Sequence, residues 1–393
     1  MTRWTLIVAL LGIWWYFLAK KTPTELHGFC DSRFGKLCRK FRDMVQDDRD
    51  GASLAMLWKG KVIVNLYGGY ADREANRVWE ENTTAIAYST TKIWAGLTAA
   101  ILASRGLLYY DEKVSSFWPE FAKNGKHNTT VRDVLDHRAG LITFGRDFSL
   151  EEAADSKAVS ALIEEAVPHW TPGSSRGYHA LTYGFLIDEI IRRLDPINRT
   201  VAEIYSEEIW KEGIDFQIGS RNMDERLIAR VSNPSIVESV ISHVKRPMKF
   251  FNVLLSHIKR GGLARKSASY PHFMGILRRD SIPYNDPKIR QLPSISCMGI
   301  GTALGFARSI EQVITRKLIA DEIWNLMRVP TATEEDIVLA TVKSFGHGLT
   351  YAQNPVKENI IIVMLRNGLR AGEDGMQELE EISRTIFQTT IDA

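Results

Sequence analysis

Apolar residues near the two ends of the chain recur with the periods of regular secondary structure. Residues 31–46, "DSRFGKLCRKFRDMVQ", carry apolar side chains at helical spacing and predict an amphipathic helix. Two apolar runs over 52–58 and 61–67 meet at Lys59-Gly60 and predict a β-hairpin. Near the other end, the run over 360–365 has the composition of a buried strand. We therefore expect strands that lie far apart in sequence to share one sheet.

Helical patterns dominate the middle of the chain, from about residue 111 to 293, and a polar-faced helix is expected over 376–389. Together these elements predict an α/β fold of the α+β type, with an antiparallel sheet flanked by N- and C-terminal helices and a large helical lobe. We assign the sheet region to residues 25–110 and 294–393, inside one domain that covers 22–393.

An uninterrupted apolar segment, "WTLIVALLGIWWYFLA" at residues 4–19, precedes this domain. As a helix it would span ~24 Å, somewhat less than the ~30 Å hydrocarbon core, and Lys20 and Lys21 can extend toward the interface. Residues 1–21 therefore predict a single-pass membrane anchor. A cleaved signal peptide is the alternative, although no clear small-x-small cleavage site follows.

Three acceptor sequences for N-glycosylation, at Asn82, Asn128 and Asn198, favour a glycoprotein whose domain is lumenal or extracellular. Such tripeptides also arise by chance, and the predicted anchor does not by itself say on which side of the membrane the domain lies.

The composition is that of a globular protein, with 45% hydrophobic and 25% charged residues. A net charge of +3 gives no support to nucleic-acid binding. Three cysteines are too few for a disulfide framework, and no group of Cys and His has zinc spacing, so no metal or cofactor is predicted. One Cys30–Cys38 bridge and free buried thiols both remain open.

Ser89 opens "STTK", a Ser-x-x-Lys spacing that recurs at Ser242 and Ser256, so the spacing alone is not specific. The context separates the three matches. The helix predicted over 90–104 is apolar on nearly every face, so it must be buried and must carry Lys92 inside. A buried ammonium is costly, and residues i and i+3 share a helix face. Ser89 is thus the candidate nucleophile and Lys92 its base, with a helix cap followed by an ordinary lysine as the alternative.

Tyr178 follows the Pro-Gly turn of "WTPGSSRGYHALTYGFL" and precedes a helix predicted over 180–193. A tyrosine at such a junction can place its hydroxyl in a cleft, where cationic neighbours favour the phenolate form. From this stretch alone, an amphipathic core tyrosine is the preferred interpretation.

The chain resembles the serine β-lactamase and penicillin-binding-protein superfamily, on the branch of class C-like enzymes and their esterase relatives. The resemblance runs from about residue 28 to the C-terminal helix and rests on "GGYADRE", "YSTTK", "GLLYYDEKVSSFWPEFAKNGK", "TVRDVLDHRAGL", "WTPGSSRGYHALTYGFL" and "FGHG". It implies an acyl-serine hydrolase in which Ser89 is the nucleophile, Lys92 its base and Tyr178 a second base and proton relay. It also implies that His347 and Gly348 contact substrate, on a strand that supplies one oxyanion-hole N–H while Ser89 supplies the other.

Two positions depart from the family pattern. The second motif often reads Tyr-x-Asn, whereas this chain has Tyr178-His179-Ala180, as some esterase-like branches do. The third motif is shortened, because Leu349 follows Gly348 where relatives continue into a glycine-rich segment. A leucine there is expected to crowd the approach of substrate to the strand.

The leading hypothesis is a membrane-anchored serine hydrolase that cleaves a small-molecule or peptide ester or amide. The alternative is a non-catalytic β-lactamase-like scaffold or self-assembling membrane protein, which the shortened third motif favours. A hydrolase would be labelled by a probe that acylates the active-site serine. A scaffold would not react with such a probe and would migrate as a large particle.

Overall fold

The computed structural model describes residues 25–46, 48, 50–234, 262–276, 282–351, 360–369, 382 and 384–385. The predicted anchor over 1–21 and most of the predicted helix over 376–389 lie outside this part of the chain.

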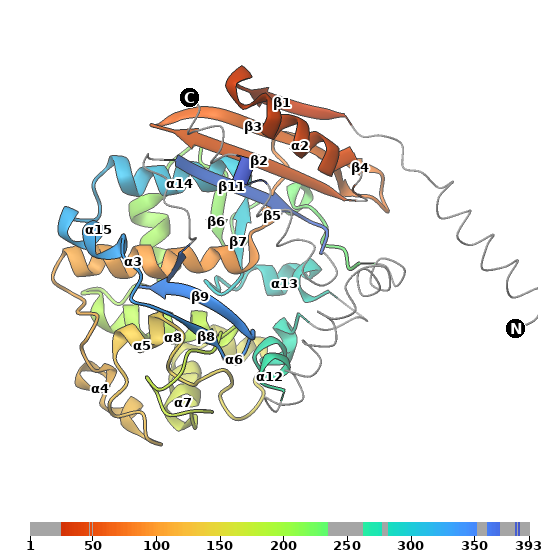
Figure 1. Ribbon diagram of the computed structural model, residues 1–393. Coiled ribbons are helices and arrows are strands. Elements are labelled where there is room, and N and C mark those ends of the chain that lie inside the picture. Colours follow the sequence, from red (N-terminus) through yellow and green to blue (C-terminus); the bar gives the residue numbers. More distant parts are fainter. Residues whose placement is uncertain are drawn as a thin grey trace, which may run out of the picture.

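Strands from both ends of the chain build the main antiparallel sheet, as predicted (Figure 1). Its strand order is β1-β3-β2-β11, and β4 pairs with the C-terminal end of β3, at Tyr70 and Asp72. Its members are β1 (Leu26–Cys30), β2 (Gly51–Trp58), β3 (Lys61–Asp72), β4 (Arg77–Val78) and β11 (Ile360–Arg366). The predicted hairpin joins β2 to β3 through Lys59 and Gly60, whose φ angles of 51° and 78° suit a tight turn between twisted strands.

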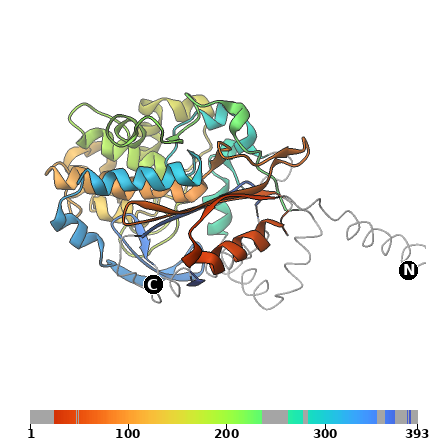
Figure 2. The same ribbon diagram turned by 90° about the horizontal axis from the view of Figure 1, so that it is seen from above.

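A helix covers each face of this sheet (Figure 2). On one face, α2 (Gly35–Gln46) buries Leu37 and Phe41 against the strands, as the apolar spacing predicted. On the other face, α14 (Ala303–Thr315) packs on β2 and β11. A Cys30–Cys38 disulfide links β1 to α2, which resolves the alternatives left open by the sequence, while Cys297 is free and buried.

The apolar helix α3 (Ile93–Ser104) runs through the interior, between the main sheet and the helical lobe (Figure 1). Residues 94–102 are all buried, because the helix has no polar face to offer to solvent. The helix predicted from residue 90 begins differently: a 3-10 turn, η2 (Tyr88–Lys92), precedes α3. Trp94 anchors α3 by packing against the rings of Tyr205 and Phe306.

The lobe consists of short helices between the two halves of the sheet region. They are α4 (Val114–Phe117), α5 (Val131–Leu135), α6 (Leu150–Ala154), α7 (Ser156–Glu165), α8 (Thr182–Leu194), α9 (Val201–Ile204), α12 (Leu263–Ser269) and α13 (Pro287–Arg290). A further helix, α15 (Asp321–Met327), contacts α3.

Two small antiparallel sheets complete the described fold, and both border α3. The first has the order β5-β7-β6, from Ala85–Ile86, Gly299–Gly301 and Phe216–Ile218. The second has the order β10-β9-β8, from Leu349–Tyr351, Thr341–Gly346 and Ala332–Asp336. Antiparallel sheets, flanking helices and a helical lobe confirm the predicted fold class.

The prediction of a single-pass membrane protein is contradicted. Within the described residues, no helix is both long and apolar enough to cross a bilayer. The longest described helices, α8 and α14, have 13 residues each, or ~20 Å against the ~30 Å of a hydrocarbon core. The three predicted glycosylation acceptors are all exposed, and their modification stays a prediction.

Candidate active site

Ser89 lies at a strand-to-helix junction that β7 holds from both sides. Before the serine, the Ala87 N–H donates to the Gly299 carbonyl at 2.7 Å. After it, the Gly299 N–H donates to Thr91 Oγ1 at 2.9 Å. Gly299 has to be small, because a Cβ there would lie 2.7 Å from Thr91 Oγ1 and 2.6 Å from the Phe216 ring. This clamp leaves Ser89 exposed between the buried residues 83–87 and the buried pair Thr91 and Lys92.

The residue before Ser89 has an unusual backbone conformation. Tyr88 has φ of 46°, in the left-handed region that bulky residues rarely occupy. Its ring is packed edge-on against Tyr284, with 5.3 Å between the ring centroids. Strained backbone of this kind persists only where the surroundings enforce it, and it is frequent at functional sites.

Lys92 is buried, with 6% of its surface exposed, as the apolar helix predicted. Its Nζ donates to the Ser296 carbonyl at 2.7 Å and to the Ala180 carbonyl at 2.9 Å. A third contact joins Nζ to Ser89 Oγ at 3.5 Å. These three oxygen atoms surround Nζ and fix it beside the serine hydroxyl.

Tyr178 is the third predicted residue that the structure brings to this place. The Lys92 Nζ lies 5.0 Å from the centroid of the Tyr178 ring, over its face. The backbone on both sides of the ring is held, because the Tyr178 N–H donates to Asp336 Oδ1 at 3.1 Å and its carbonyl accepts from Ser267 Oγ at 2.6 Å. Among the described residues, the Tyr178 hydroxyl has no hydrogen-bond partner.

Asp336 is a positioning residue that sequence reasoning missed. It is fully buried and paired with Arg176, and it also accepts the N–H groups of Val338 and Leu339 at 2.9 Å each. A buried carboxylate that is paired and hydrogen-bonded in this way is rigid. It therefore fixes the start of the Tyr178 segment against the β8 end of the second small sheet.

Two buried histidines stand behind Tyr178, and their hydrogen bonds assign their tautomers. His137 Nδ1 accepts the His179 N–H at 3.2 Å, so its proton lies on Nε2. His179 Nε2 accepts the Leu141 N–H at 2.8 Å, so Nδ1 donates to the Gly177 carbonyl. Burial lowers the pKa of His137 well below its usual value and that of His179 to about 3, and both rings are neutral.

Ala180 takes part through its backbone alone. Its N–H donates to Ser267 Oγ at 2.9 Å, and its carbonyl accepts from Lys92. Where relatives often have an asparagine side chain, this chain therefore contributes a carbonyl that holds the lysine.

His347 and Gly348 do not stand on a strand, in contrast to what the resemblance implied. They form the turn between β9 and β10, with φ of 56° and 78°. His347 is buried, with Nε2 at 3.2 Å from Arg132 Nη1, and burial lowers its pKa to about 4. The Gly348 N–H donates to Asp136 Oδ1 at 3.0 Å. This N–H is therefore already engaged by the protein.

Leu349 and the third-motif turn pack on α3 one helical turn after Lys92. A Cβ placed on Gly96 would lie 2.8 Å from the His347 carbonyl oxygen and 3.2 Å from Leu349 Cδ2. The shortened motif is thus pressed against the helix that carries the lysine. The structure brings Ser89, Lys92 and Tyr178 together and places His347 and Gly348 beside Gly96 and Asp136.

Chemically, the cluster of Ser89, Lys92 and Tyr178 has the parts of a serine nucleophile with an adjacent amine. The described residues contain no group of three or more His, Cys, Asp or Glu side chains that could hold a metal ion.

Comparison with known proteins places this geometry in a family. The sequence model of the family described as Beta-lactamase matches residues 37–375. The chain is 36% identical over 172 residues to Esterase/beta-lactamase LipL of Mycobacterium tuberculosis, which covers 43% of this chain and 39% of LipL. It is 28% identical over 152 residues to Protein flp of Staphylococcus aureus, which covers 37% of this chain and 30% of flp. The chain thus spans well under half the length of these curated relatives.

Solved structures agree with the family assignment at the level of the fold. A penicillin-binding protein homolog from Caulobacter crescentus superposes with a TM-score of 0.76 at 24% identity, over 93% of this chain and 100% of that chain. A family VIII carboxylesterase superposes with a TM-score of 0.74 at 20% identity, over 92% and 100%. Because the family model covers most of the sequence, the chain belongs to the beta-lactamase family.

Proposed function

We propose that the protein is a serine hydrolase that cleaves an ester or amide through an acyl-Ser89 intermediate. The observation that carries this proposal is the buried Lys92 amine, held by two backbone carbonyls with Ser89 Oγ at 3.5 Å. The names of relatives, esterase/beta-lactamase and carboxylesterase, support the same reaction class.

In the acylation step, Ser89 Oγ gives its proton to the neutral Lys92 amine and attacks the carbonyl carbon of the substrate. The carbonyl oxygen becomes an oxyanion, and the Ser89 N–H at the start of the helical segment is the donor that we assign to it. Collapse of this intermediate breaks the C–O or C–N bond, and the leaving group takes a proton from Lys92 or Tyr178. The product of this step is an ester of Ser89.

In the deacylation step, a water molecule attacks the acyl carbon and gives its proton to the same pair of groups. The bond to Ser89 Oγ then breaks, Oγ regains a proton, and a carboxylic acid leaves. Tyr178 is assigned the role of proton relay because its ring lies beside Lys92. A shift of the tyrosine hydroxyl toward Nζ on substrate binding is part of this assignment, since apo hydrogen bonds at catalytic sites are often long.

The substrate that we propose is a small-molecule or peptide ester or amide. Ala180 stands at the position where relatives often carry the asparagine that orients a lactam, and "YHA" also occurs on esterase-like branches. An ester is therefore the preferred substrate within this class.

Covalent labelling tests the proposal directly. A fluorophosphonate probe should label the wild-type chain, and p-nitrophenyl acetate should be hydrolysed. Ser89→Ala should lose both, whereas Ser256→Ala, which removes the serine of another Ser-x-x-Lys match, should keep both. Equal labelling of Ser89→Ala and wild type would refute the assignment.

A non-catalytic scaffold is the second candidate, and one observation favours it. The Gly348 N–H of the third motif is bound by Asp136, so it is not free to receive an oxyanion. On this alternative, a folded wild-type chain would react with neither probe nor ester and would migrate as a large assembly in size-exclusion chromatography.

A further inference from the structure

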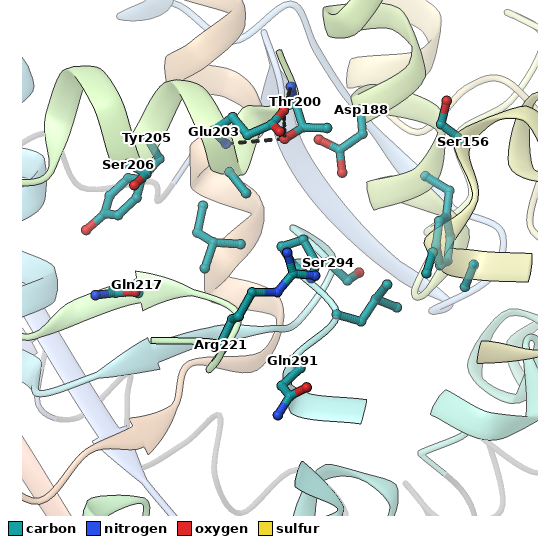
Figure 3. A pocket seen from close by; sticks show the side chains of 18 of the residues that line it. Ser156, Asp188, Thr200, Glu203, Tyr205, Ser206, Gln217, Arg221, Gln291 and Ser294 are labelled. Atoms are coloured by element: carbon teal, nitrogen blue, oxygen red, sulfur yellow. Dashed lines mark hydrogen bonds between the residues drawn. The ribbon is translucent and has the colours of Figure 1, made fainter. Parts of the chain in front are cut away.

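A second cavity, of about 360 Å³, lies apart from the candidate active site (Figure 3). Its walls include parts of α6, α7, α8, α9 and β6 and the 291–294 segment. Ser89, Lys92 and Tyr178 do not line it. Its size and its mixture of apolar and polar walls are those of a small-molecule site.

Asp188 supplies a carboxyl group with an unused acceptor to this cavity. Oδ1 accepts the Val201 N–H at 3.0 Å, whereas Oδ2 has no hydrogen-bond partner among the described residues. Figure 3 shows the Asp188 carboxyl directed into the space between the lining side chains. Burial is the main reason that the pKa of Asp188 is raised to about 7; the Val201 N–H and Arg192 lower this pKa, and the nearby Glu189 and Glu203 carboxylates raise it.

The other two carboxylates at this end of the cavity already have partners. Glu189 Oε2 accepts from Ser160 Oγ at 2.7 Å and pairs with Arg193. Glu203 accepts the Thr200 N–H and hydroxyl in a helix-capping box. Asp188 is therefore the carboxyl in this group that is available to a ligand.

A cationic side chain, Arg221, lines the same cavity. Arg221 follows β6, is exposed, and forms no hydrogen bond or ion pair within the described residues. In Figure 3 its side chain extends into the middle of the lining residues, from a different element than Asp188. Arg192 adds a buried Nε that lies 3.9 Å from Glu189 Oε1 and, in the part of the chain that the structure describes, has no hydrogen-bond partner.

We propose that this cavity binds a small zwitterion, such as an amino acid, with its ammonium group at Asp188 and its carboxylate at Arg221. A carboxyl acceptor and a guanidinium that have no partner among the described residues, in one cavity, favour a ligand that carries both complementary charges. Guanidinium groups bind carboxylates well because two N–H donors match the two oxygens.

The cavity also has a structural connection to the candidate active site. Ser294 lines the cavity, and two residues later the Ser296 carbonyl accepts from Lys92 at 2.7 Å. Ser296 Oγ in turn joins this segment to α8, since it accepts the Gly184 N–H at 2.7 Å. A ligand that shifts the 291–296 segment would therefore move an acceptor of the lysine. This second effect rests on the proposed function, whereas binding itself does not.

Calorimetric titration of the full chain carrying Ser89→Ala tests binding without turnover. The probes are glycine, 4-aminobutanoate and 6-aminohexanoate, with butylamine and butanoate as ligands of a single charge. At least one zwitterion should bind with a Kd below 10 mM, and removal of either charge should weaken binding at least tenfold. Binding should also be about tenfold tighter at pH 8 than at pH 6, because the Asp188 carboxylate must be ionised.

Two variants assign the charges. Asp188→Asn should weaken binding of the zwitterion at least tenfold and abolish the pH dependence of its Kd. Arg221→Gln should weaken binding without changing that pH dependence. Asp224→Asn, which removes an exposed carboxylate outside the cavity, is the matched control and should bind normally. Arg221 is exposed, so its variant is expected to fold even if Asp188→Asn does not.

Binding of no zwitterion up to 10 mM would overturn the proposal, as would equal affinity of both variants and the wild type. In the active chain, the bound probe should change the rate of ester hydrolysis. Binding without such a change would leave the site in place and refute its connection to Lys92.

Discussion

Asp136→Asn should make the protein more stable, and only above about pH 5. The Asp136 side chain is 2% exposed, and its Oδ2 has no hydrogen-bond partner among the described residues. Burial raises the pKa of this carboxyl to about 6, although the Gly348 N–H and the nearby Arg132, Arg176 and Arg138 guanidiniums pull it down. Arg132 lowers the pKa of Asp136 only partly, because its guanidinium donates hydrogen bonds to Asp111 at 2.7 and 3.0 Å.

The sign of the effect follows from proton linkage. Between about pH 4 and pH 6 the folded protein keeps the Asp136 proton while the unfolded chain has lost it, so the free energy of unfolding falls as pH rises through this window. A shift from 3.8 to about 6 corresponds to roughly 3 kcal/mol. Asparagine keeps an oxygen for the Gly348 N–H and cannot ionise, although its amide N–H groups need partners, at a cost of about 1 kcal/mol. The net gain expected at pH 8 is about 1 to 2 kcal/mol.

Urea unfolding followed by tryptophan fluorescence, at several pH values from 4.5 to 8, measures this difference. The gain of Asp136→Asn over wild type should grow with pH and level off above about pH 7. Asp133→Ala is the matched control on the same helix, because it loses the capping interaction with Thr130. Asparagine would keep an oxygen for the Thr130 N–H and hydroxyl, so the control variant used is the alanine, which should lose about 1 kcal/mol at every pH in this range. If Asp136→Asn were less stable than wild type at pH 8, or more stable by the same amount at every pH, this reasoning would be wrong.

Three further changes test the surroundings of the candidate site. Lys92→Met should reduce the rate of ester hydrolysis by at least about 100-fold. The control is Lys126→Met, which removes a fully buried lysine that likewise donates to two backbone carbonyls. This control should lower the midpoint of thermal unfolding but leave the hydrolysis rate per folded molecule unchanged. Gly96→Ala should lower the free energy of unfolding by about 1 to 2 kcal/mol, because the new methyl group would collide with the His347 carbonyl oxygen. Gly35→Ala should have almost no effect in the same urea assay, because the nearest atom there is the flexible end of Arg39. Arg176→Met should lower the free energy of unfolding by about 3 to 5 kcal/mol, because it removes the guanidinium that pairs with the buried Asp336 carboxylate. A decrease of less than about 1 kcal/mol in urea unfolding would contradict this explanation.

Local sequence patterns predicted the elements that local physics determines. The turn at Lys59-Gly60, the apolar stripe of α2 and the all-apolar α3 follow from backbone preference and burial alone. The burial of Lys92 followed from α3 in the same way. The 3-10 turn before α3 was not predicted, because it depends on the β7 clamp around Ser89, which comes from more than 200 residues away.

The partners of the candidate site could not be predicted from sequence. Ser296 and Ala180 hold Lys92 through carbonyl oxygens, which every residue has and no motif marks. Asp336 and Ser267 position Tyr178 across separations of 158 and 89 residues. The location of His347 was predicted wrongly for a related reason: strand β9 ends at Gly346, and His347 and Gly348 form the turn into β10 instead of continuing the expected strand.

Because carbonyl oxygens hold the lysine, its placement is insulated from many substitutions. A replacement at position 180 or 296 changes a side chain but leaves the acceptor, so long as the backbone path is kept. Evolutionary drift at position 180 would therefore spare the acceptor of Nζ, whereas position 296 is constrained by its side chain as well, because Ser296 Oγ accepts the Gly184 N–H.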